Sequence, residues 1–183
     1  MLVSAICGSL RTGSYNQALL NAAIARAPGH GLEIVQGDIA HFPLFSADYE
    51  KAGWPPQVED VRALVRSSEC LLLVGPEYNY GVSGVLKNAF DFLSRPVRDP
   101  TLFRRPLALM GASTGYMGTI RAQMAWRQTA AFLKAPVFNE AEVTLAFAGK
   151  AFDESGTLVD EAYIRMLEDY LDKLHVWLSD PCR

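Results

Sequence analysis

Residues 2–25 read LVSAIC, GSLRTGSYN and QALLNAAIA, an apolar run followed by a polar loop and a helix-forming segment. This order predicts a strand, a tight loop and a helix. Gly8 and Gly13 allow the loop to turn sharply, and the unpaired backbone N–H groups at the start of the helix point back into it. A strand, loop and helix in this order form a cradle for a phosphate group.

The composition of the loop favours a single phosphate monoester over a nucleoside triphosphate. Leu10 stands where a dinucleotide-binding motif has glycine, and Ser14 follows Gly13 where a P-loop has lysine. The loop instead offers short hydroxyl and amide donors and one permanent charge, that of Arg11. A simpler interpretation stays open, in which Ser14 caps an ordinary helix and Arg11 is a solvated surface residue.

Length and charge limit the classes of protein to consider. A chain of 183 residues predicts a single domain over residues 1–183. With 17 basic and 20 acidic side chains and no basic run, neither nucleic acid nor an anionic membrane surface is an expected partner. The longest apolar stretch, residues 70–75, is too short to span a bilayer, and no charged segment precedes Met1. We therefore expect a soluble protein that is not exported.

The cysteines and histidines do not form a recognisable metal or redox motif. Cys7, Cys70 and Cys182 cannot all pair, and their spacing fits neither a zinc site nor a CxxC motif. Cys7 and Cys70 fall in predicted strands, where a thiol usually acts as a small buried side chain. The three histidines are too scattered for a metal site. We expect a cytoplasmic protein with no metal and no catalytic cysteine.

The rest of the chain alternates apolar runs with helical patterns, which is typical of an α/β fold. Runs without alternation belong to parallel strands that are covered on both faces. Further strands are predicted over residues 32–35, 70–75 and 106–111, with residues 137–138 and 143–145 as candidates for the last strand. Helices are predicted over residues 58–67, 85–93, 120–133 and 159–178. The aromatic connection over residues 37–56 either walls a pocket or covers the edge of the sheet.

Three glycine-bearing loops, residues 8–16, 76–84 and 112–119, follow predicted strands. Ligands of an open doubly wound sheet bind outside the carboxyl ends of the strands, where the strand order reverses. In a sheet of order 2-1-3-4-5, the first two of these loops flank that point. Pro76 and Tyr78, with the backbone around them, offer a flat, apolar edge that suits a planar heterocycle.

Two charged features have simple structural interpretations. Glu77 lies in a loop, and we expect its side chain to be a solvated charge. Lys87 and Asp91 are four residues apart in a predicted helix, so an ion pair along that helix explains both.

Three groups of residues occur together in this chain. They are Gly8-Ser9-Leu10-Arg11 with Ser14 and Asn16, then Pro76-Glu77-Tyr78-Asn79 with Gly84, Leu86-Lys87-Asn88 and Asp91, and finally Ser113, Gly115, Gly118 and Arg121. Over nearly its whole length the chain resembles the NADPH-dependent FMN reductase family, in particular its quinone and chromate reductases.

The resemblance implies a flavodoxin-like fold, a three-layer sandwich with a five-stranded parallel sheet of order 2-1-3-4-5. It also implies non-covalently bound FMN, hydride taken from NADH or NADPH, and two electrons passed to quinones, azo or nitro compounds, or metal oxyanions such as chromate. The cofactor carries this chemistry, so no catalytic side chain is required. By position, the FMN phosphate would be held by Ser9, Arg11, Ser14 and Asn16, and the isoalloxazine ring would be bordered by Pro76, Glu77, Tyr78, Asn79, Ser113 and Gly115.

The family also implies a homodimer or homotetramer. Two adjacent helices carry more aromatic bulk than one face of a sheet needs, from Phe90, Phe92, Trp126 and Phe132. One residue departs from the family pattern, because Thr119 stands where a second consecutive glycine is common. We expect its β-branched side chain to narrow the site there.

Two other functions stay open, a flavodoxin-type electron carrier and a flavin-binding module without turnover. A carrier is expected to show a strongly acidic docking surface, and the net charge is only −3. The sequence therefore favours an enzyme that passes electrons to a small-molecule acceptor.

Overall fold

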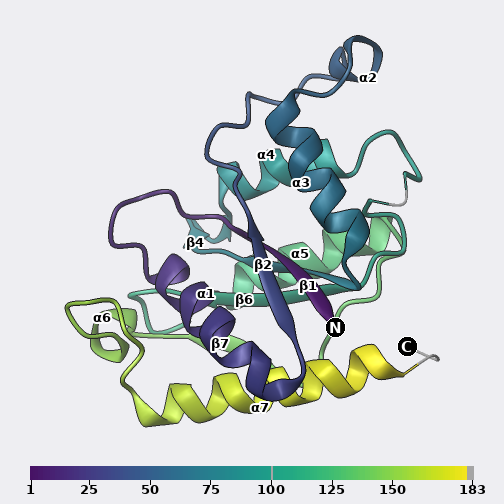
Figure 1. Cartoon of the computed structure of the whole chain (residues 1–183). Helices are drawn as coiled ribbons and strands as arrows, with labels where there is room; N and C mark the ends of the chain where they lie inside the picture. Colours follow the sequence, from purple (N-terminus) through teal and green to yellow (C-terminus); the bar gives the residue numbers. More distant parts are fainter. Residues whose placement is uncertain (100, 181–183) are drawn as a thin grey trace.

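One parallel sheet with helices on both faces organises the computed structural model, which describes residues 1–99 and 101–180 (Figure 1). The sheet has five strands in the order β2-β1-β3-β6-β7. Counting only these strands, the order is 2-1-3-4-5, so the predicted flavodoxin-like topology is confirmed. Their bounds are β1 (Leu2–Cys7), β2 (Glu33–Gly37), β3 (Cys70–Val74), β6 (Leu107–Ala112) and β7 (Val143–Leu145).

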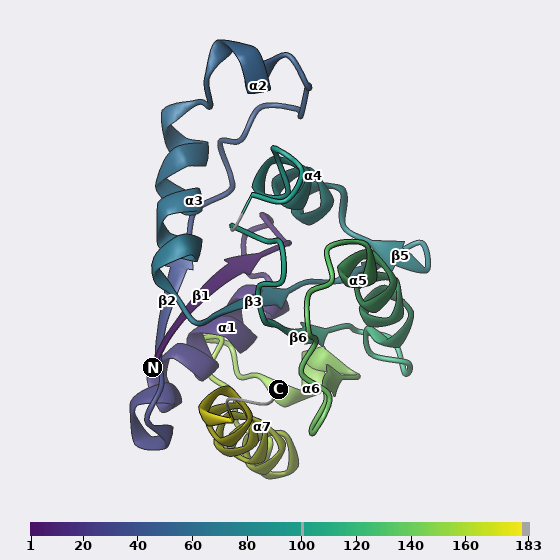
Figure 2. The ribbon, with the colours of Figure 1, turned by 90° about the vertical axis from the view of Figure 1, so that its right-hand side faces the viewer.

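The longer helices form two layers, one on each side of the sheet, as Figure 2 shows. One layer consists of α1 (Tyr15–Arg26) and α7 (Glu161–Ser179). The other consists of α3 (Pro56–Ser67), α4 (Gly84–Leu93) and α5 (Ile120–Phe132). The connections contain the short elements η1 (Ala27–His30), α2 (Tyr49–Ala52), the hairpin strands β4 (Glu77–Tyr78) and β5 (Gly81–Val82), and α6 (Ala148–Ala151).

Alternate residues of the three central strands, β1, β3 and β6, enter two separate hydrophobic cores. In β1, Val3, Ala5 and Cys7 pack toward α1 and α7, whereas Ile6 packs toward the other layer. These central strands therefore need apolar residues at both odd and even positions, which is why they appear in the sequence as apolar runs, whereas the edge strand β2 (EIVQG) does not. No helix in the described part of the chain is both long enough and apolar enough to cross a membrane.

The structure settles the element boundaries that the sequence left open. The fifth strand is β7, while Val137 forms only an isolated parallel bridge with Leu107. Helix α7 begins at Glu161 because Asp160 caps it, accepting hydrogen bonds from the N–H groups of Ala162 and Tyr163. The hairpin β4–β5 was not predicted, since strands of two residues leave no periodic pattern.

The aromatic connection over residues 37–56 packs mainly against α4. Phe92 is fully buried, and four aromatic rings surround it with centroid distances of 5.2 to 6.1 Å, those of Phe42, Phe45, Tyr49 and Trp54. Asn88 fixes the connection to α4, because its amide accepts a hydrogen bond from Phe45 N (2.8 Å) and donates one to Pro43 O (2.8 Å). These aromatic side chains thus cover Phe92 of α4, which is neither the edge of the sheet nor the wall of a pocket that the two interpretations expected.

A buried arginine ties α3 to the end of α4. Arg62 is only 1% exposed, and its guanidinium donates to the carbonyl oxygens of Phe92 (3.0 Å) and Arg95 (2.5 Å). Its Nη2 lies 3.1 Å from Asp99 Oδ2, and its Nε lies 3.2 Å from Glu59 Oε2. Burial opposes ionisation of Asp99, but hydrogen bonds from Thr101 and the charges of Arg62 and Arg66 outweigh it and lower the pKa of that carboxyl. The cluster therefore depends on an ionised Asp99.

We expect Asp99→Asn to lower the free energy of unfolding at pH 7 by about 2 to 3 kcal/mol, because it leaves the buried Arg62 cation with a weaker partner. Because the pKa of Asp99 is lower in the folded than in the unfolded state, its ionised carboxylate stabilises the fold at pH values above the unfolded pKa. This stabilisation is lost as the pH falls through the folded pKa. The difference between the two proteins should therefore persist at neutral pH and close only in the acid range, measured by urea unfolding. Asp169→Asn, which removes an exposed pair with Lys173, is the control and should cost under about 0.5 kcal/mol.

Candidate functional site

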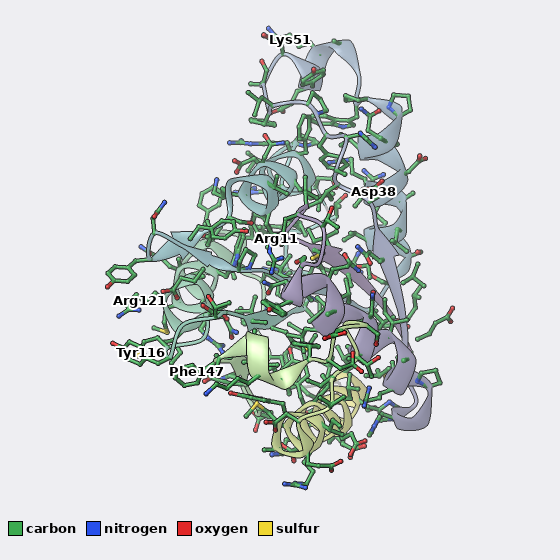
Figure 3. All side chains as sticks on the ribbon, turned by 90° about the vertical axis from the view of Figure 1, so that its left-hand side faces the viewer. Arg11, Asp38, Lys51, Tyr116, Arg121 and Phe147 are labelled. Carbon is green, nitrogen blue, oxygen red and sulfur yellow. The ribbon has the colours of Figure 1, made fainter. Side chains whose placement is uncertain are left out.

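Four loops gather at the edge of the sheet where the strands end. They are the first loop (residues 8–14, after β1), the second loop (75–83, after β3), the third loop (113–119, after β6) and the fourth loop (146–160, after β7). Figure 3 looks onto this edge, with Arg11 near its centre, Asp38 on one side, and Tyr116, Arg121 and Phe147 on the other. The parallel topology thus brings together segments that are far apart in the sequence, as predicted.

The first loop delivers a helix N-terminus to this edge. Gly13 has a φ of +65°, a conformation that favours glycine, and this turn leads directly into the cap of α1. Ser14 Oγ accepts a hydrogen bond from Gln17 N at 3.2 Å. The N–H groups of Tyr15 and Asn16 precede the first intrahelical hydrogen bond, so they remain available as donors to an anion. Ser14 is therefore a helix cap, and that role is compatible with a phosphate cradle.

Arg11 is exposed at the tip of this loop. Its guanidinium carbon lies 5.0 Å from the centroid of the Tyr15 ring, and its Nη1 donates to Thr12 O at 3.2 Å. No carboxylate among the described residues forms an ion pair with it. Arg11 borders two hollows, one of about 240 Å³ shared with Ser9 and one of about 480 Å³ shared with Ser14. The cation is thus free to turn toward a ligand on either side of the loop.

Asn16 has a structural task that sequence reasoning did not foresee. Its side chain is buried, donating to Ala112 O (2.9 Å) and accepting from Ala112 N (2.9 Å). These two bonds fix the start of α1 to the end of β6. The side-chain amide is therefore engaged, and the donor that Asn16 offers to a phosphate is its backbone N–H group.

Cys7 ends β1 directly below the first loop. The thiol is 3% exposed, and its Sγ lies 3.8 Å from Ser9 O. Burial raises the pKa of this thiol, so it stays protonated near neutral pH and is a poor nucleophile. Cys70 is also fully buried, whereas Cys182 lies outside the described residues. Nor do the described residues contain three grouped His, Cys, Asp or Glu side chains that could hold a metal ion.

The second loop projects as the hairpin β4–β5. Glu77 pairs with Val82, and Tyr78 pairs with Gly81. The two residues at the turn, Asn79 and Tyr80, have φ angles of 51° and 64°, the left-handed pair that a two-residue hairpin turn requires. This turn places the ring of Tyr80 under the guanidinium carbon of Arg121, 4.1 Å from the ring centroid.

The expectation that Glu77 is a solvated charge is wrong. The Glu77 side chain is only 8% exposed, and its Oε2 accepts hydrogen bonds from the backbone N–H groups of Arg121 (2.9 Å) and Ala122 (3.2 Å). Its Oε1 also lies 3.2 Å from Arg121 Nη1. The carboxylate caps the N-terminus of α5, where the helix dipole favours a negative charge. A loop position carries no sign of this role, because the partner helix begins 43 residues later in the chain.

The second and third loops enclose a hollow of about 260 Å³. Four of the residues assigned to the ring site line it, Glu77, Asn79, Ser113 and Gly115. Pro76 is buried beneath the loop and Tyr78 is exposed beside it, and neither lines this hollow. The sequence assignment missed Tyr80, Tyr116 and Met117, which also line it. The available sequence signal for these residues was their position in loops that follow strands. The two tyrosines could have been assigned to the site from that position.

Thr119 does not narrow the site, contrary to expectation. Its side chain is fully buried and packs over Gly111, where an added Cβ would overlap Thr119 Oγ1. Thr119 Oγ1 also accepts a hydrogen bond from Gln123 Nε2 at 3.1 Å. The neighbouring Gly118 is the position that requires glycine. Its φ is +58°, and a Cβ added there would lie 2.5 Å from Thr144 O. The threonine therefore supports the third loop from below.

The fourth loop was not assigned to the site from the sequence. It is fixed to the third loop by hydrogen bonds from Phe147 N to Gly115 O (3.2 Å) and from Ala148 N to Ser113 O (2.9 Å). Farther along it, Phe152 stacks on Tyr15 with a centroid distance of 5.8 Å, and Asp153 lines the larger hollow beside Arg11. A phosphate bound at the first loop would therefore have the fourth loop as a neighbour.

Comparison with known proteins gives the same family as the motifs. The family model described as NADPH-dependent FMN reductase matches residues 1–150. The chain belongs to the NADPH-dependent FMN reductase family. It is therefore an oxidoreductase with FMN as its cofactor and NAD(P)H as its electron donor. The resemblance inferred from the loop motifs is confirmed.

Individual members of this family are similar over almost their whole length. The chain is 43% identical over 176 residues to an NAD(P)H-dependent FMN reductase of Pseudomonas aeruginosa, covering 96% of this chain and 94% of that one. It is 42% identical over 164 residues to an NAD(P)H:quinone oxidoreductase of Solanum tuberosum, covering 87% and 83%. Among solved structures, the flavoenzyme FerB of Paracoccus denitrificans, an NAD(P)H:(acceptor) oxidoreductase, superposes with a TM-score of 0.87 at 26% identity, covering 97% of this chain and 96% of FerB.

The chemistry of the donors fits FMN. The first loop offers an unpaired arginine, two serines and the N–H groups of a helix N-terminus, which match a phosphate dianion. The hollow between the second and third loops is lined by Tyr80 and Tyr116, and its two charged side chains, Glu77 and Arg121, pair with each other, which leaves a lining that matches a flat heterocycle. The phosphate and the ring would thus occupy two separate parts of the same edge.

We expect Arg11→Ala to weaken FMN binding by about one to two powers of ten, the loss of one charge-assisted hydrogen bond. The N–H groups at the start of α1 remain, so binding should weaken without vanishing. Titrating FMN and riboflavin into the apoprotein and following flavin fluorescence measures the effect.

Riboflavin is the control, since it carries the ring without the phosphate and should bind both proteins equally. A matched variant is Arg165→Ala, which removes an exposed cation of α7 and should leave both affinities unchanged. An equal loss for FMN and riboflavin would assign the effect to damage of the fold, and an unchanged FMN affinity would exclude Arg11 from the cradle.

Proposed function

We propose that the protein is an FMN-dependent NAD(P)H oxidoreductase that passes two electrons to quinones or related acceptors. Azo and nitro compounds and metal oxyanions such as chromate belong to the same class of acceptor. The observation that carries this proposal is the division of one sheet edge into a phosphate cradle and an aromatic-walled hollow. Cys7, the thiol below the first loop, has a pKa raised by burial and is not an activated nucleophile. FMN supplies hydride acceptance and two-electron donation when it is bound.

The residues of the chain have binding and positioning roles in this proposal. Ser9, Arg11, Ser14 and the N–H group of Asn16 hold the phosphate, which fixes the cofactor at one end. The hairpin backbone from Pro76 to Asn79 borders the ring on one side, and Ser113 and Gly115 border it on the other. Glu77 acts through Arg121 and the start of α5, holding the second loop against the third. The distance between these two loops sets the space for a flat ring.

Exposed tyrosines at the open side of the hollow suit a planar acceptor. Tyr80 and Tyr116 are 74% and 73% exposed, and both line the hollow. A quinone that stacks between such rings displaces little ordered structure and buries aromatic area on both faces. The 42% identical relative of Solanum tuberosum carries the name NAD(P)H:quinone oxidoreductase, which supports this class of acceptor.

Steady-state turnover tests the proposed activity. The FMN-loaded protein should oxidise NADH or NADPH with consumption of one equivalent of a water-soluble benzoquinone, followed by absorbance at 340 nm and by quinone reduction. A flavodoxin-type carrier predicts the opposite result. If reduction by NAD(P)H is undetectable while a stable one-electron-reduced flavin accumulates under dithionite, the carrier function replaces this proposal. A bound flavin that neither donor reduces would favour a non-catalytic module.

We infer that the protein forms a homodimer, and that two such dimers can associate into a homotetramer. Three of the aromatic residues offered as support lie in the core, since Phe90, Phe92 and Trp126 are buried, and only Phe132 is exposed. Two further exposed apolar residues of α5, Ile120 and Met124, support self-association. They are four residues apart, so they share one face of the helix, and the hairpin with the exposed Tyr80 packs against the same helix.

We expect light scattering at micromolar concentration to give a mass of about twice the 20.1 kDa of one chain. Met124→Glu should shift the protein toward the monomer, because it places a charge in the centre of an apolar interface. Val176→Glu is the matched control, since Val176 is an exposed apolar residue of α7 on the other layer. A monomeric wild type, or an equal shift for the two variants, would contradict this interface.

The remaining expectations are a single domain and a cytoplasmic location. Both hydrophobic cores share one sheet, which supports folding of residues 1–183 as one domain. The buried free thiol of Cys7 supports a reducing compartment.

A further inference from the structure

Another hollow lies at the opposite end of the sheet from the four loops. It has a volume of about 560 Å³ and lies between the end of α4, the connection to β6 and the end of α5. In Figure 1 the connection from α4 to β6 is on the right, whereas the first loop and α6 are on the left. Its position separates this hollow from the flavin site by the length of the sheet.

Three basic side chains line this hollow, those of Arg98, Arg104 and Lys134. Within residues 1–99 and 101–180, none of the three forms an ion pair with a carboxylate. Elsewhere basic residues are commonly compensated, as Lys87 is by Asp91 and Arg127 is by Glu142. A protein with a net charge of −3 thus concentrates unpaired positive charge at one hollow.

The negative ends of nearby helix dipoles offset only part of this positive charge. Both α4 and α5 end at the hollow, and each helix C-terminus carries a partial charge of roughly −0.5. Together the two ends offset about one of the three cations, which leaves a surplus of about two positive charges. A surplus of this size matches a phosphate dianion.

The backbone holds these cations at some cost to stability. Lys134 follows α5 with a φ of 53°, where its N–H group bonds to Ala131 O (3.1 Å) and that of Ala135 bonds to Ala130 O (3.1 Å). This pattern of helix termination normally uses glycine at the position of Lys134. Arg98 and Arg104 are also left-handed, with φ angles of 69° and 59°. Three basic residues therefore adopt a conformation that glycine or asparagine would adopt more easily.

The other walls of the hollow are apolar. Phe132 and Val97 are exposed, and Phe103 lies beside the cations with its ring centroid 5.5 Å from the guanidinium carbon of Arg104. A ligand that fits both kinds of wall combines an anionic group with a flat or apolar body. The overall negative charge of the protein disfavours an anionic membrane as the source of that group.

We propose that this hollow binds a small soluble molecule that carries a phosphate dianion on an aromatic body, as a nucleoside monophosphate does. The phosphate lies among Arg98, Arg104 and Lys134, and the ring packs against Phe132. The site is separate from the phosphate cradle of the first loop, so the protein binds this ligand and FMN at the same time.

Calorimetric titration of AMP into the FMN-loaded protein, freed of excess FMN, tests the proposal. We expect saturable binding of AMP at millimolar concentration or below, and at least about tenfold weaker binding of adenosine, which lacks the phosphate. Raising the salt concentration should weaken AMP binding, because the contact is ionic and exposed.

Arg104→Asn combined with Lys134→Asn should weaken AMP binding by about tenfold or more. Asparagine tolerates left-handed backbone, so this double variant keeps the fold, which retention of FMN verifies. The matched control is Lys51→Gln combined with Arg165→Gln, which removes two exposed cations elsewhere and should change the affinity less than about twofold.

Three results would overturn the proposal. They are an absence of AMP binding to the wild type, equal affinities for AMP and adenosine, and an unchanged affinity in the Arg104→Asn/Lys134→Asn variant. Sedimentation with vesicles of phosphatidic acid and phosphatidylcholine is a further arm. Vesicle binding that the double variant loses, without AMP binding, would assign the hollow to a lipid headgroup and refute the soluble ligand.

Discussion

The hydrogen-bond ladder of the sheet extends one residue beyond its strands, and the geometry of the site depends on this extension. Gly8 N bonds to Val74 O (2.8 Å), Gly75 N to Met110 O (3.1 Å) and Ser113 N to Leu145 O (2.9 Å). Each of the first three loops therefore begins with its backbone already fixed to the neighbouring strand. The loops start from a rigid frame. Residues of different loops, which are far apart in the sequence, are therefore held at a fixed distance from one another.

Cross-links between loops and helices complete this frame. The buried amide of Asn16 joins α1 to Ala112, and the carboxylate of Glu77 joins the hairpin to α5. Leaving a buried polar partner unsatisfied costs about 1 to 3 kcal/mol, so each cross-link resists separation of the loops it joins. Rigid placement of donors is what a flavoprotein needs, because the protein orients the cofactor and the cofactor performs the electron transfer.

The fold could be predicted from the sequence because its signals are local or periodic. Uninterrupted apolar runs marked β1, β3 and β6, and a helical pattern marked α7, so the order of elements and the doubly wound sheet followed. The first loop was recognised through its glycines and short polar side chains. Its helix cap at Ser14 was also predictable, since a cap acts within one turn of chain.

The errors concern side chains whose partners are distant in the sequence. Glu77 was expected to be solvated because nothing near it reveals the N-terminus of α5. Thr119 was expected to narrow the site, but its side chain packs over Gly111 instead. Tyr80 was missed because its contact with Arg121 exists only after the hairpin folds against α5. Single-sequence patterns report which residues share an element, and they do not report which atoms meet across elements.

The carboxylate of Glu77 also affects at which end of the site the negative end of an elongated anion can bind. Two helix N-termini border the hollows of this edge, those of α1 and α5, and either would attract a phosphate group. At α5 the protein's own carboxylate already occupies the N–H groups and would repel a second negative charge. Of these two termini, that of α1 has no carboxylate among the described residues bonded to its N–H groups. The Glu77 carboxylate therefore disfavours a phosphate group at the α5 side of the hollow, and it does so without having to touch the cofactor.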